Sequence, residues 1–499
     1  MVEDRRNFGL IPGVQAKLAL MMRGAKRKLL ARFTKQWFSA FLSHWDLWLL
    51  GAVVALSLGL RLARLDGVPG NVTADELDNL QTAYHILEAT GPSFFGFDWK
   101  PSPAFSTHLI AGSMKLMGMS IVAMRLPSAV LSTLALVSFY FLARQAISRP
   151  AALLAAILLA TSLWYLHFSR SGWENVHGAL YGTSAALFLD LALQKRRLAY
   201  YALCGLFCVL GLLSFFSNAF IIVGIYAYLP FAIVLHKKQR KQILLGYGLV
   251  ALVAMSLFAP QLRSILENWD HATLRIRVVS IFSVQGEYLG DSSVASILWH
   301  QLLRTVRGFL LMDTSVMGYG YWSRYIPPSR GFLDVGTALF FWTGLSASLL
   351  YWRRTVLWWL MLLALLVPQV LSTGTPDGAR GVAAAPFMYL FVGLGINGFF
   401  EGLSMLGRRM KFSRLVLPVV TLALVTLLTL IVWANVRGYF SWMQSHQALR
   451  TREPAVDRQL FPYWQALALQ AARERRLLGM EEWRKWLDVY GESLTPNGR

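Results

Sequence analysis

Two acidic residues, Asp75 and Glu76, stand side by side at the start of segment 74–89, whose apolar residues recur at helical spacing. A carboxylate held at such a helix start can act as a general base, because it can take the proton from an attacking hydroxyl group. A local structural role is equally available. Thr73-x-x-Glu76 spells a capping box, and Asp75 suits the positive end of a helix. The two interpretations are compatible if Glu76 caps the helix while Asp75 points away.

Three basic residues in the same part of the chain or in short loops are candidate phosphate ligands. Lys100 lies in Lys-Pro-Ser-Pro, where the prolines stiffen the backbone, so it is either a fixed cation beside a lipid phosphate or a snorkelling interfacial lysine. Arg170 and Arg380 stand in short loops, and the guanidinium fork matches phosphate oxygens. Each arginine also has a possible local partner, Glu174 for Arg170 and Asp377 for Arg380.

Further polar side chains in these segments are candidate substrate contacts. They are Tyr84, Asp98, His108 and Glu174. The acids Asp75, Glu76, Asp78 and Asp98 could offer oxygen ligands to a divalent cation. No zinc cluster is available, since Cys204 and Cys208 are the only cysteines and lie four apart in one apolar run. We expect no required cofactor, and a divalent cation stays an open alternative.

The elements that must position these residues are membrane helices. Apolar residues make up 56% of the 499-residue chain and charged residues only 15%, with a mean hydropathy of +0.46. This composition excludes a soluble protein of this length and predicts an all-α polytopic membrane protein. We expect about eleven spans, within a range of about ten to thirteen. They lie near 46–65, 125–146, 151–168, 177–193, 198–215, 218–235, 243–260, 332–351, 355–371, 384–403 and 414–436.

The net charge of +22 indicates topology rather than nucleic-acid binding, because basic residues cluster at the ends of apolar runs in alternate loops. This alternation places the basic N-terminus, residues 1–45, in the cytoplasm. The segments expected to face outward are 66–124, 169–176, 261–330, 372–383 and the tail 437–499. Segments 74–89 and 104–117 of the first outward loop predict two juxtamembrane helices. In the tail, stretches 460–478 and 480–490 predict two short helices that could rest on the membrane.

The order of these motifs resembles the GT-C superfamily of glycosyltransferases, in particular the branch of protein O-mannosyltransferases and the lipid A aminoarabinose transferase. The matching motifs are Ala-Asp75-Glu76-(x)6-Ala-Tyr84, Lys100-Pro-x-Pro, Gly118-x-Ser-(x)4-Arg125-Leu-Pro-Ser, Phe168-Ser-Arg170 and Arg380-(x)5-Pro386. The resemblance covers residues 45–235 best. It implies a polyprenyl-phosphate sugar donor, Asp75 as the catalytic base and Lys100 as a contact to the lipid phosphate. Transfer would go to a hydroxyl group of a protein or lipid-linked acceptor, with inversion, at the outer face of the cell membrane.

Two other functional classes stay open at this stage. An O-antigen-type polymerase or ligase would use the arginines of the large outward loop 261–330. A lipid or glycan transporter would need ionisable residues at mid-depth in the membrane, whereas here they lie mainly at the outer ends of the spans.

Overall fold

The computed structural model describes residues 43–282, 293–316, 331–409, 413–444, 455–457 and 461–476, together with a few isolated positions between 478 and 489. Met1–Ala52 and Val53–Arg499 form two compact units. The candidate site lies wholly within the second unit. The predicted cytoplasmic N-terminus lies almost entirely outside the described residues, as does most of the second predicted tail helix.

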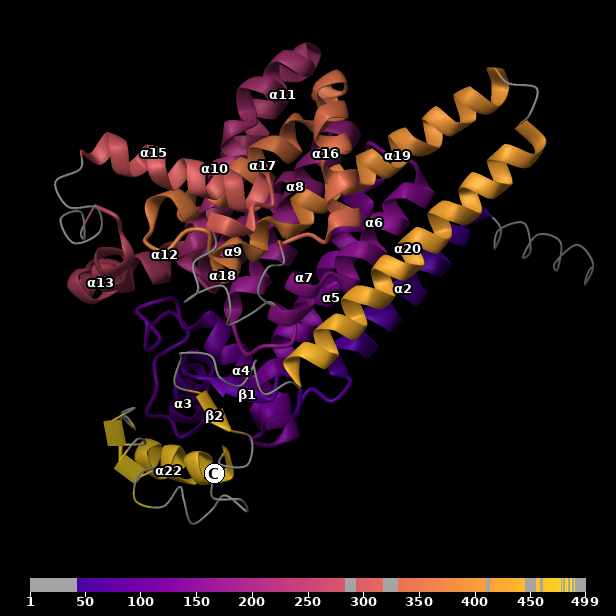
Figure 1. The fold of residues 1–499 in the computed structure, drawn as a ribbon. Helices are drawn as coiled ribbons and strands as arrows, with labels where there is room; N and C mark the ends of the chain where they lie inside the picture. Colours follow the sequence, from indigo (N-terminus) through magenta and orange to yellow (C-terminus); the bar gives the residue numbers. More distant parts are fainter. Residues whose placement is uncertain are drawn as a thin grey trace, which may run out of the picture. The chain divides into compact units, whose positions relative to one another are not determined.

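The described residues confirm the predicted all-α class (Figure 1). Apart from two three-residue strands, the regular elements of these ranges are helical. The first half contains α2 (Trp45–Leu62), α3 (Ala74–Leu87), α4 (Phe105–Met117), α5 (Ile121–Ala143), α6 (Arg149–Thr161), α7 (Leu163–Phe168), α8 (His177–Lys195), α9 (Leu198–Ser214), α10 (Ala219–Ala227) and α11 (Leu229–Leu235). The second half contains α12 (Arg240–Glu267), α13 (Trp269–Val279), α15 (Val294–Thr305), α16 (Val335–Leu350), α17 (Trp352–Leu371), α18 (Gly378–Gly381), α19 (Ala385–Arg409), α20 (Ser413–Met443) and α22 (Phe461–Arg473).

Eight helical segments of the described chain are long and apolar enough to cross a membrane. Three shorter apolar helices, α6, α9 and α16, lie where three further spans were predicted. Every predicted span therefore coincides with an apolar helix, while the total of eleven crossings stays a prediction. The chain is a multi-pass membrane protein.

Burial identifies the helices at the centre of the bundle. The apolar stretches of the spans that contain α19 and α8 are 89% and 83% buried. The corresponding stretches of α12 and α20 are only 22% buried. Close approach between α16 and α19 depends on glycine. A Cβ on Gly344 would lie 1.8 Å from the Phe391 carbonyl oxygen, and one on Gly395 would lie 2.0 Å from that of Phe340. Such small residues let helix backbones touch, which is how membrane helices commonly associate.

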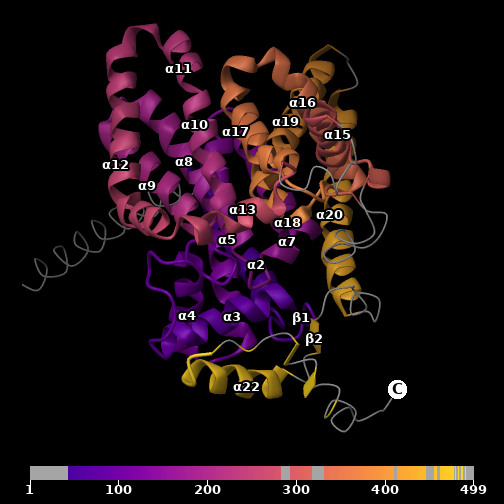
Figure 2. The ribbon, with the colours of Figure 1, turned by 90° about the vertical axis from the view of Figure 1, so that its left-hand side faces the viewer.

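Residues 66–124 fold against one end of the bundle and contain α3 and α4, where the sequence predicts two juxtamembrane helices (Figure 1). The strand β1 (Asn71–Thr73) leads directly into α3, and α4 packs between α3 and α5. The tail returns to the same place. Its strand β2 (Ala455–Asp457) pairs antiparallel with β1, and α22 packs on α3, as both views show (Figures 1 and 2). The first predicted tail helix thus exists, and its apolar face packs on protein rather than on the membrane.

The large outward segment 261–330 is largely helical where it is described. Its first residues continue α12 to Glu267, and α13 and α15 follow. Several of its arginines are occupied by near neighbours in the chain: Arg263 pairs with Glu267, Arg277 with Asp270, and Arg307 with Asp313. Arg324 and Arg330 lie outside the described residues. These local pairs supply no converging set of arginines of the kind that the polymerase alternative requires.

Candidate active site

The start of α3 is fixed by the capping box that the sequence predicts. The Thr73 hydroxyl accepts the Glu76 backbone N–H at 3.4 Å, and the Glu76 carboxylate accepts the Thr73 N–H at 3.1 Å. Glu76 has further partners. Its Oε1 accepts hydrogen bonds from Arg125 Nε at 2.9 Å and from the Gly172 N–H at 2.8 Å. Glu76 is buried and engaged through both oxygens, which favours a structural role for it over the predicted catalytic one.

Asp75, the next residue towards the N-terminus, has a different environment. Its side chain is half-buried, and it forms no hydrogen bond or ion pair with any residue of the described chain. Asp78 lies one helical turn further along α3. Burial raises the pKa of Asp78 to about 7, the charge of Asp75 raises it further, and Lys100 opposes the increase. The charges of Asp75 and Lys100 therefore both act on the Asp78 carboxyl group.

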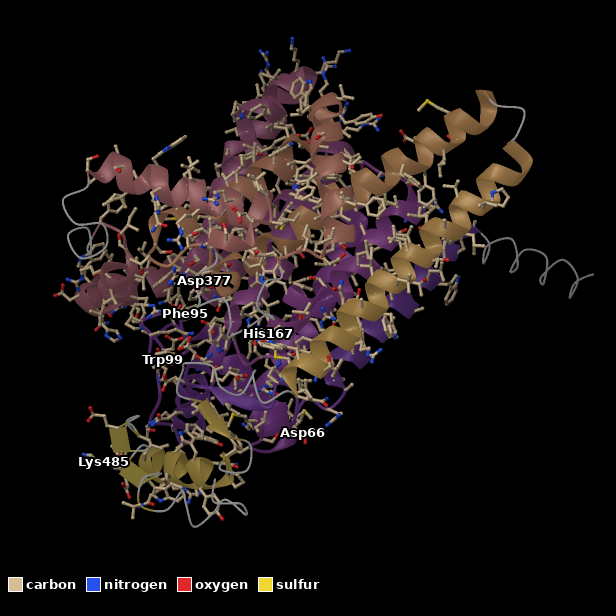
Figure 3. The ribbon with its side chains drawn as sticks, viewed as in Figure 1. Asp66, Phe95, Trp99, His167, Asp377 and Lys485 are labelled. Carbon is tan, nitrogen blue, oxygen red and sulfur yellow. The ribbon has the colours of Figure 1, made fainter. Side chains whose placement is uncertain are left out.

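The Lys100 loop is a tight turn built by Asp98. Asp98 Oδ1 accepts the backbone N–H groups of Lys100 at 3.1 Å and Ser102 at 2.9 Å, and its own N–H donates to the Ser102 carbonyl. Burial raises the pKa of Asp98 to about 7, although Lys100 partly offsets this. Asp98 was a candidate substrate contact. Its buried carboxylate instead shapes the loop, which Figure 3 locates by the neighbouring Trp99.

The ammonium of Lys100 is buried and paired. Its Nζ lies 2.6 Å from Glu174 Oε1, with side-chain exposures of 6% and 3%. Burial opposes the charge of Lys100, but Glu174, Asp75 and Asp98 outweigh burial and raise the pKa of the ammonium. The snorkelling alternative is therefore wrong, because a snorkelling lysine keeps its charged end in water.

Asn79 joins the helix to the lysine loop and was not singled out by sequence. Its Nδ2 donates to Glu174 Oε2 at 3.1 Å and to the Gly172 carbonyl at 2.9 Å, while its Oδ1 accepts the Trp99 indole N–H at 2.9 Å. Asn79 lies four residues after Asp75, on the same face of α3. That spacing was the available signal. We call Asp75, Asp78, Asn79, Lys100 and Glu174 the acid–lysine cluster.

Arg170 is not placed as a phosphate ligand. Its two terminal nitrogens donate to the backbone carbonyls at and after the end of α2, namely Leu60, Arg61, Ala63, Arg64 and Val68. The last carbonyls of a helix lack internal partners, and Arg170 satisfies them. Its guanidinium also lies 4.9 Å from the ring centre of Phe440. These contacts favour a structural role for Arg170 over the predicted phosphate role, and the alternative pair with Glu174 is absent among the described contacts because Lys100 holds that carboxylate.

The Arg380 side chain is partly buried and contacts residues of its own loop. Its Nη1 donates to the Ser372 hydroxyl at 2.8 Å and to the Thr373 carbonyl, and its Nε lies 3.5 Å from Asp377 Oδ2, which confirms the predicted local partner. Asp377, labelled in Figure 3, also caps α18. The short helix α18 packs against η1 (Glu174–Val176). The Arg380 loop and the acid–lysine cluster thus share η1 as a common neighbour.

Two remaining candidates lie elsewhere. The Tyr84 ring is fully buried in an apolar cluster on the opposite face of α3, so its predicted substrate contact is corrected to packing. His108 on α4 is half-buried, with Nδ1 3.0 Å from the Ala104 carbonyl oxygen and its ring against Phe94. Neither of these interactions connects His108 to the acid–lysine cluster.

A cavity of about 460 Å³ lies apart from this cluster, between α7, the start of α16 and the outer part of α20. Its polar lining consists of Ser162, Asp334 and Asn435, of which Asp334 and Asn435 are hydrogen-bonded to each other at 2.9 Å. Asp334 also caps α16. We place the candidate chemistry at the acid–lysine cluster, because there the Asp75 carboxylate has no hydrogen-bond or ion-pair partner among the described residues.

The family comparison points to one class of enzyme. Residues 101–263 match the family described as dolichyl-phosphate-mannose-protein mannosyltransferase. No curated protein sequence matches the chain. The family match begins within the Lys100-Pro-Ser-Pro motif and ends in α12.

Solved structures give the fold. The chain is similar to ArnT from Cupriavidus metallidurans in the apo state, with a TM-score of 0.54 and 13% identity over 89% of this chain and 88% of that one. The same protein bound to undecaprenyl phosphate gives 0.55 and 13%, over 90% and 91%. The Archaeoglobus fulgidus oligosaccharyltransferase gives 0.53 and 16%, over 87% of this chain and 57% of that one. The fold is therefore that of the GT-C membrane glycosyltransferases. The family match and this fold confirm the predicted resemblance to the branch that contains the O-mannosyltransferases and ArnT.

Proposed function

We propose that this protein is a membrane glycosyltransferase that moves a sugar from a polyprenyl-phosphate carrier to a hydroxyl group of a protein or lipid-linked acceptor. The family match, the GT-C fold and the undecaprenyl phosphate bound by ArnT support the class of donor. The basic clusters of alternate loops support a cytoplasmic N-terminus and an active site on the outer face of the cell membrane.

The observation that carries the mechanism is the Asp75 carboxylate, which has no hydrogen-bond or ion-pair partner among the described residues and whose charge acts on the buried Lys100. A hydroxyl group is a poor nucleophile until a positioned base takes its proton. A departing phosphate is already acidic, so it needs stabilisation of its charge rather than a proton. One carboxylate and a cation are therefore enough for direct displacement with inversion, in contrast to the carboxylate pair of glycoside hydrolases.

Asp75, Lys100 and Arg380 then have distinct roles. Asp75 takes the proton of the acceptor hydroxyl as the new glycosidic bond forms. Its charge contributes to the raised pKa of Asp78. Lys100 stabilises the phosphate that leaves the anomeric carbon, and Arg380 is a second cation that becomes available if its bonds to Ser372 and Thr373 open.

The test is transfer from synthetic polyprenyl-phosphate sugars by the purified protein. Asp75→Asn should lower kcat by at least about 100-fold with donor binding unchanged, because a general base contributes about that much or more. Asp78→Asn is the matched control on the same helix and should keep most of the activity. Turnover in Asp75→Asn would remove Asp75 as the base. Movement of the donor across the bilayer without bond cleavage would instead indicate a transporter.

We further propose that transfer needs no metal ion. The proposed step calls for one base and one cation, and Asp75 and Lys100 are the residues proposed for these roles. Activity should therefore survive chelation. Loss of activity on chelation, with recovery on adding Mg²⁺ or Mn²⁺, would contradict this proposal and favour the acidic residues as ligands.

A further inference from the structure

The tail of the chain returns to the helix that carries the proposed base. Strand β2 pairs antiparallel with β1, with Asn71 opposite Asp457, Val72 opposite Val456 and Thr73 opposite Ala455. Thr73 is both the last residue of β1 and the N-cap of α3. The pairing therefore ends two residues before Asp75, across a sequence separation of more than 380 residues.

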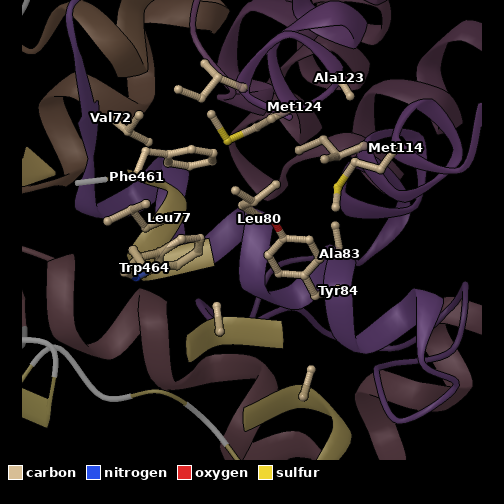
Figure 4. Packing of buried hydrophobic residues seen from close by; sticks show 14 of the residues in the cluster. Val72, Leu77, Leu80, Ala83, Tyr84, Met114, Ala123, Met124, Phe461 and Trp464 are labelled. Carbon is tan, nitrogen blue, oxygen red and sulfur yellow. The ribbon is translucent and has the colours of Figure 1, made fainter. Parts of the chain in front are cut away.

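An apolar core continues this attachment along α3. Phe461 and Trp464 of α22 are buried in one cluster with Val72, Leu77 and Leu80 (Figure 4). The rings of Trp464 and Tyr84 lie 6.4 Å apart, and Trp464 is 2% exposed. The tail thus covers the face of α3 that carries Leu77, Leu80 and Tyr84. At 100° per residue, this face is opposite to the one that carries Asp75 and Asn79.

Polar contacts hold α22 at both ends of this interface. The Gln465 side chain donates to the Met119 carbonyl at 2.8 Å, just before α5 begins. The Thr90 hydroxyl, just after α3 ends, donates to the Ala472 carbonyl at 3.4 Å. These contacts and the strand pair place the tail against the segments that precede and follow α3.

The need for such support follows from the helix itself. With 14 residues, α3 has a length at which helices are only marginally stable alone, so its position depends on packing of its apolar face. Truncation of a buried aromatic side chain such as Trp464 leaves a cavity and removes the packing that holds such an element in place. A catalytic group displaced by about 1 Å can lose about 100-fold in rate.

We propose that the tail residues 455–457 and 461–476 form a fixed positioning element for Asp75, with Trp464 as its principal positioning residue. This inference rests on the proposed function. Among the described residues, no hydrogen bond or ion pair joins this part of the tail to the acid–lysine cluster or to the Lys100 loop. It acts by holding α3, and hence the proposed base, at a set distance from the lysine loop.

The first experiment compares three full-length variants. Trp464→Ala should lower kcat by about 10- to 100-fold while the donor KM stays within about twofold, since the phosphate-binding lysine is held by other segments. Trp464→Phe should recover most of kcat, because an aromatic ring still fills the site. Tyr463→Ala removes a neighbouring aromatic side chain that is 42% exposed, and should behave as wild type. A wild-type kcat in Trp464→Ala, or a rise in KM with kcat unchanged, would overturn the proposal.

A second experiment distinguishes a fixed support from a moving cover, and it does not require Trp464→Ala to fold. Asn71→Cys with Asp457→Cys would link paired positions of β1 and β2, whose spacing in an antiparallel pair suits a disulfide. The native Cys204 and Cys208 are buried and do not compete. The oxidised variant should turn over at the wild-type rate. Loss of turnover that a reductant restores would mean that the tail must open, which contradicts a fixed element.

The two proposals can fail separately. If Asp75→Asn is inactive and Trp464→Ala has normal kcat, only the positioning role fails. If Asp75→Asn is active, the assignment of the base fails, whatever Trp464→Ala does.

Discussion

The Lys100 ammonium lies 2.6 Å from the Glu174 carboxylate, and both side chains are buried. The cation that we assign to the donor phosphate therefore already has an anionic partner in the donor-free protein. A buried ion pair is held because neither charge can easily be left alone. If Lys100 binds the donor phosphate, that phosphate must share Lys100 with Glu174 or displace the Glu174 carboxylate. We therefore expect Glu174 to oppose donor binding.

This competition predicts that Glu174→Gln binds the donor more tightly. The amide keeps the shape of the side chain and can still accept the Asn79 hydrogen bond, but it no longer neutralises Lys100. We expect the Kd for polyprenyl phosphate to fall by about tenfold, the equivalent of one charge-assisted hydrogen bond of about 1.4 kcal/mol. The measurement is binding of polyprenyl phosphate to the purified protein. The matched control is Lys100→Met combined with Glu174→Gln, which leaves no buried charge unpaired and should bind weakly. Weaker binding in Glu174→Gln alone would make Glu174 a support for Lys100 rather than its competitor.

Substitutions of the neighbouring acids Asp75 and Glu76 should have different effects: one should change catalysis and the other stability. Glu76 is buried against Arg125, so Glu76→Gln leaves the guanidinium without its counter-ion. Breaking a buried pair in this way costs about 3–5 kcal/mol. Asp75→Asn, which breaks no internal bond, should leave stability unchanged. Thermal unfolding of the purified variants in detergent measures both effects. A destabilised Asp75→Asn, or a Glu76→Gln as stable as wild type, would reverse the roles assigned to the two residues.

Arg170 offers a test of support against substrate binding. Its guanidinium satisfies a set of backbone carbonyls at and after the end of α2, and the three donors of a lysine ammonium cannot reproduce that fork. Arg170→Lys should lower the unfolding temperature and the yield of folded protein, while the folded fraction keeps the wild-type donor Kd. If instead the donor Kd rises while stability is unchanged, Arg170 binds phosphate as the sequence first suggested.

Asp98 predicts how stability changes with pH. Burial raises its pKa from 3.8 to about 7, so the folded protein holds the Asp98 proton more tightly than the unfolded chain does. The resulting stabilisation is fully present at acidic pH. It is lost as the pH rises from about 4 through about 7, because the folded state must then carry a buried carboxylate. Asp98→Asn cannot ionise and still accepts the turn hydrogen bonds. The unfolding temperature of wild type should therefore fall more between pH 5 and pH 8 than that of Asp98→Asn. If the unfolding temperature of both proteins changes equally with pH, the pKa of Asp98 is not raised in the folded protein.

The sequence by itself determined the features that depend on near neighbours in the chain. Apolar runs predicted the membrane helices, since each must satisfy its own backbone in lipid. The capping box at Thr73 and Glu76 was readable because its partners are three residues apart. The order of motifs around Asp75 and Lys100 also indicated the GT-C class, which the fold bears out.

Only the tertiary structure decided which partner each charged side chain takes. Lys100 pairs with Glu174 rather than standing free, and Arg170 reaches back more than 100 residues to the end of α2. The tail was predicted as separate short helices, yet α22 packs on α3 and β2 pairs with β1. The reason is physical. Periodicity and caps are local, whereas the partner of a buried charge or an apolar face is whichever group the fold brings within a few ångströms, irrespective of its distance along the chain.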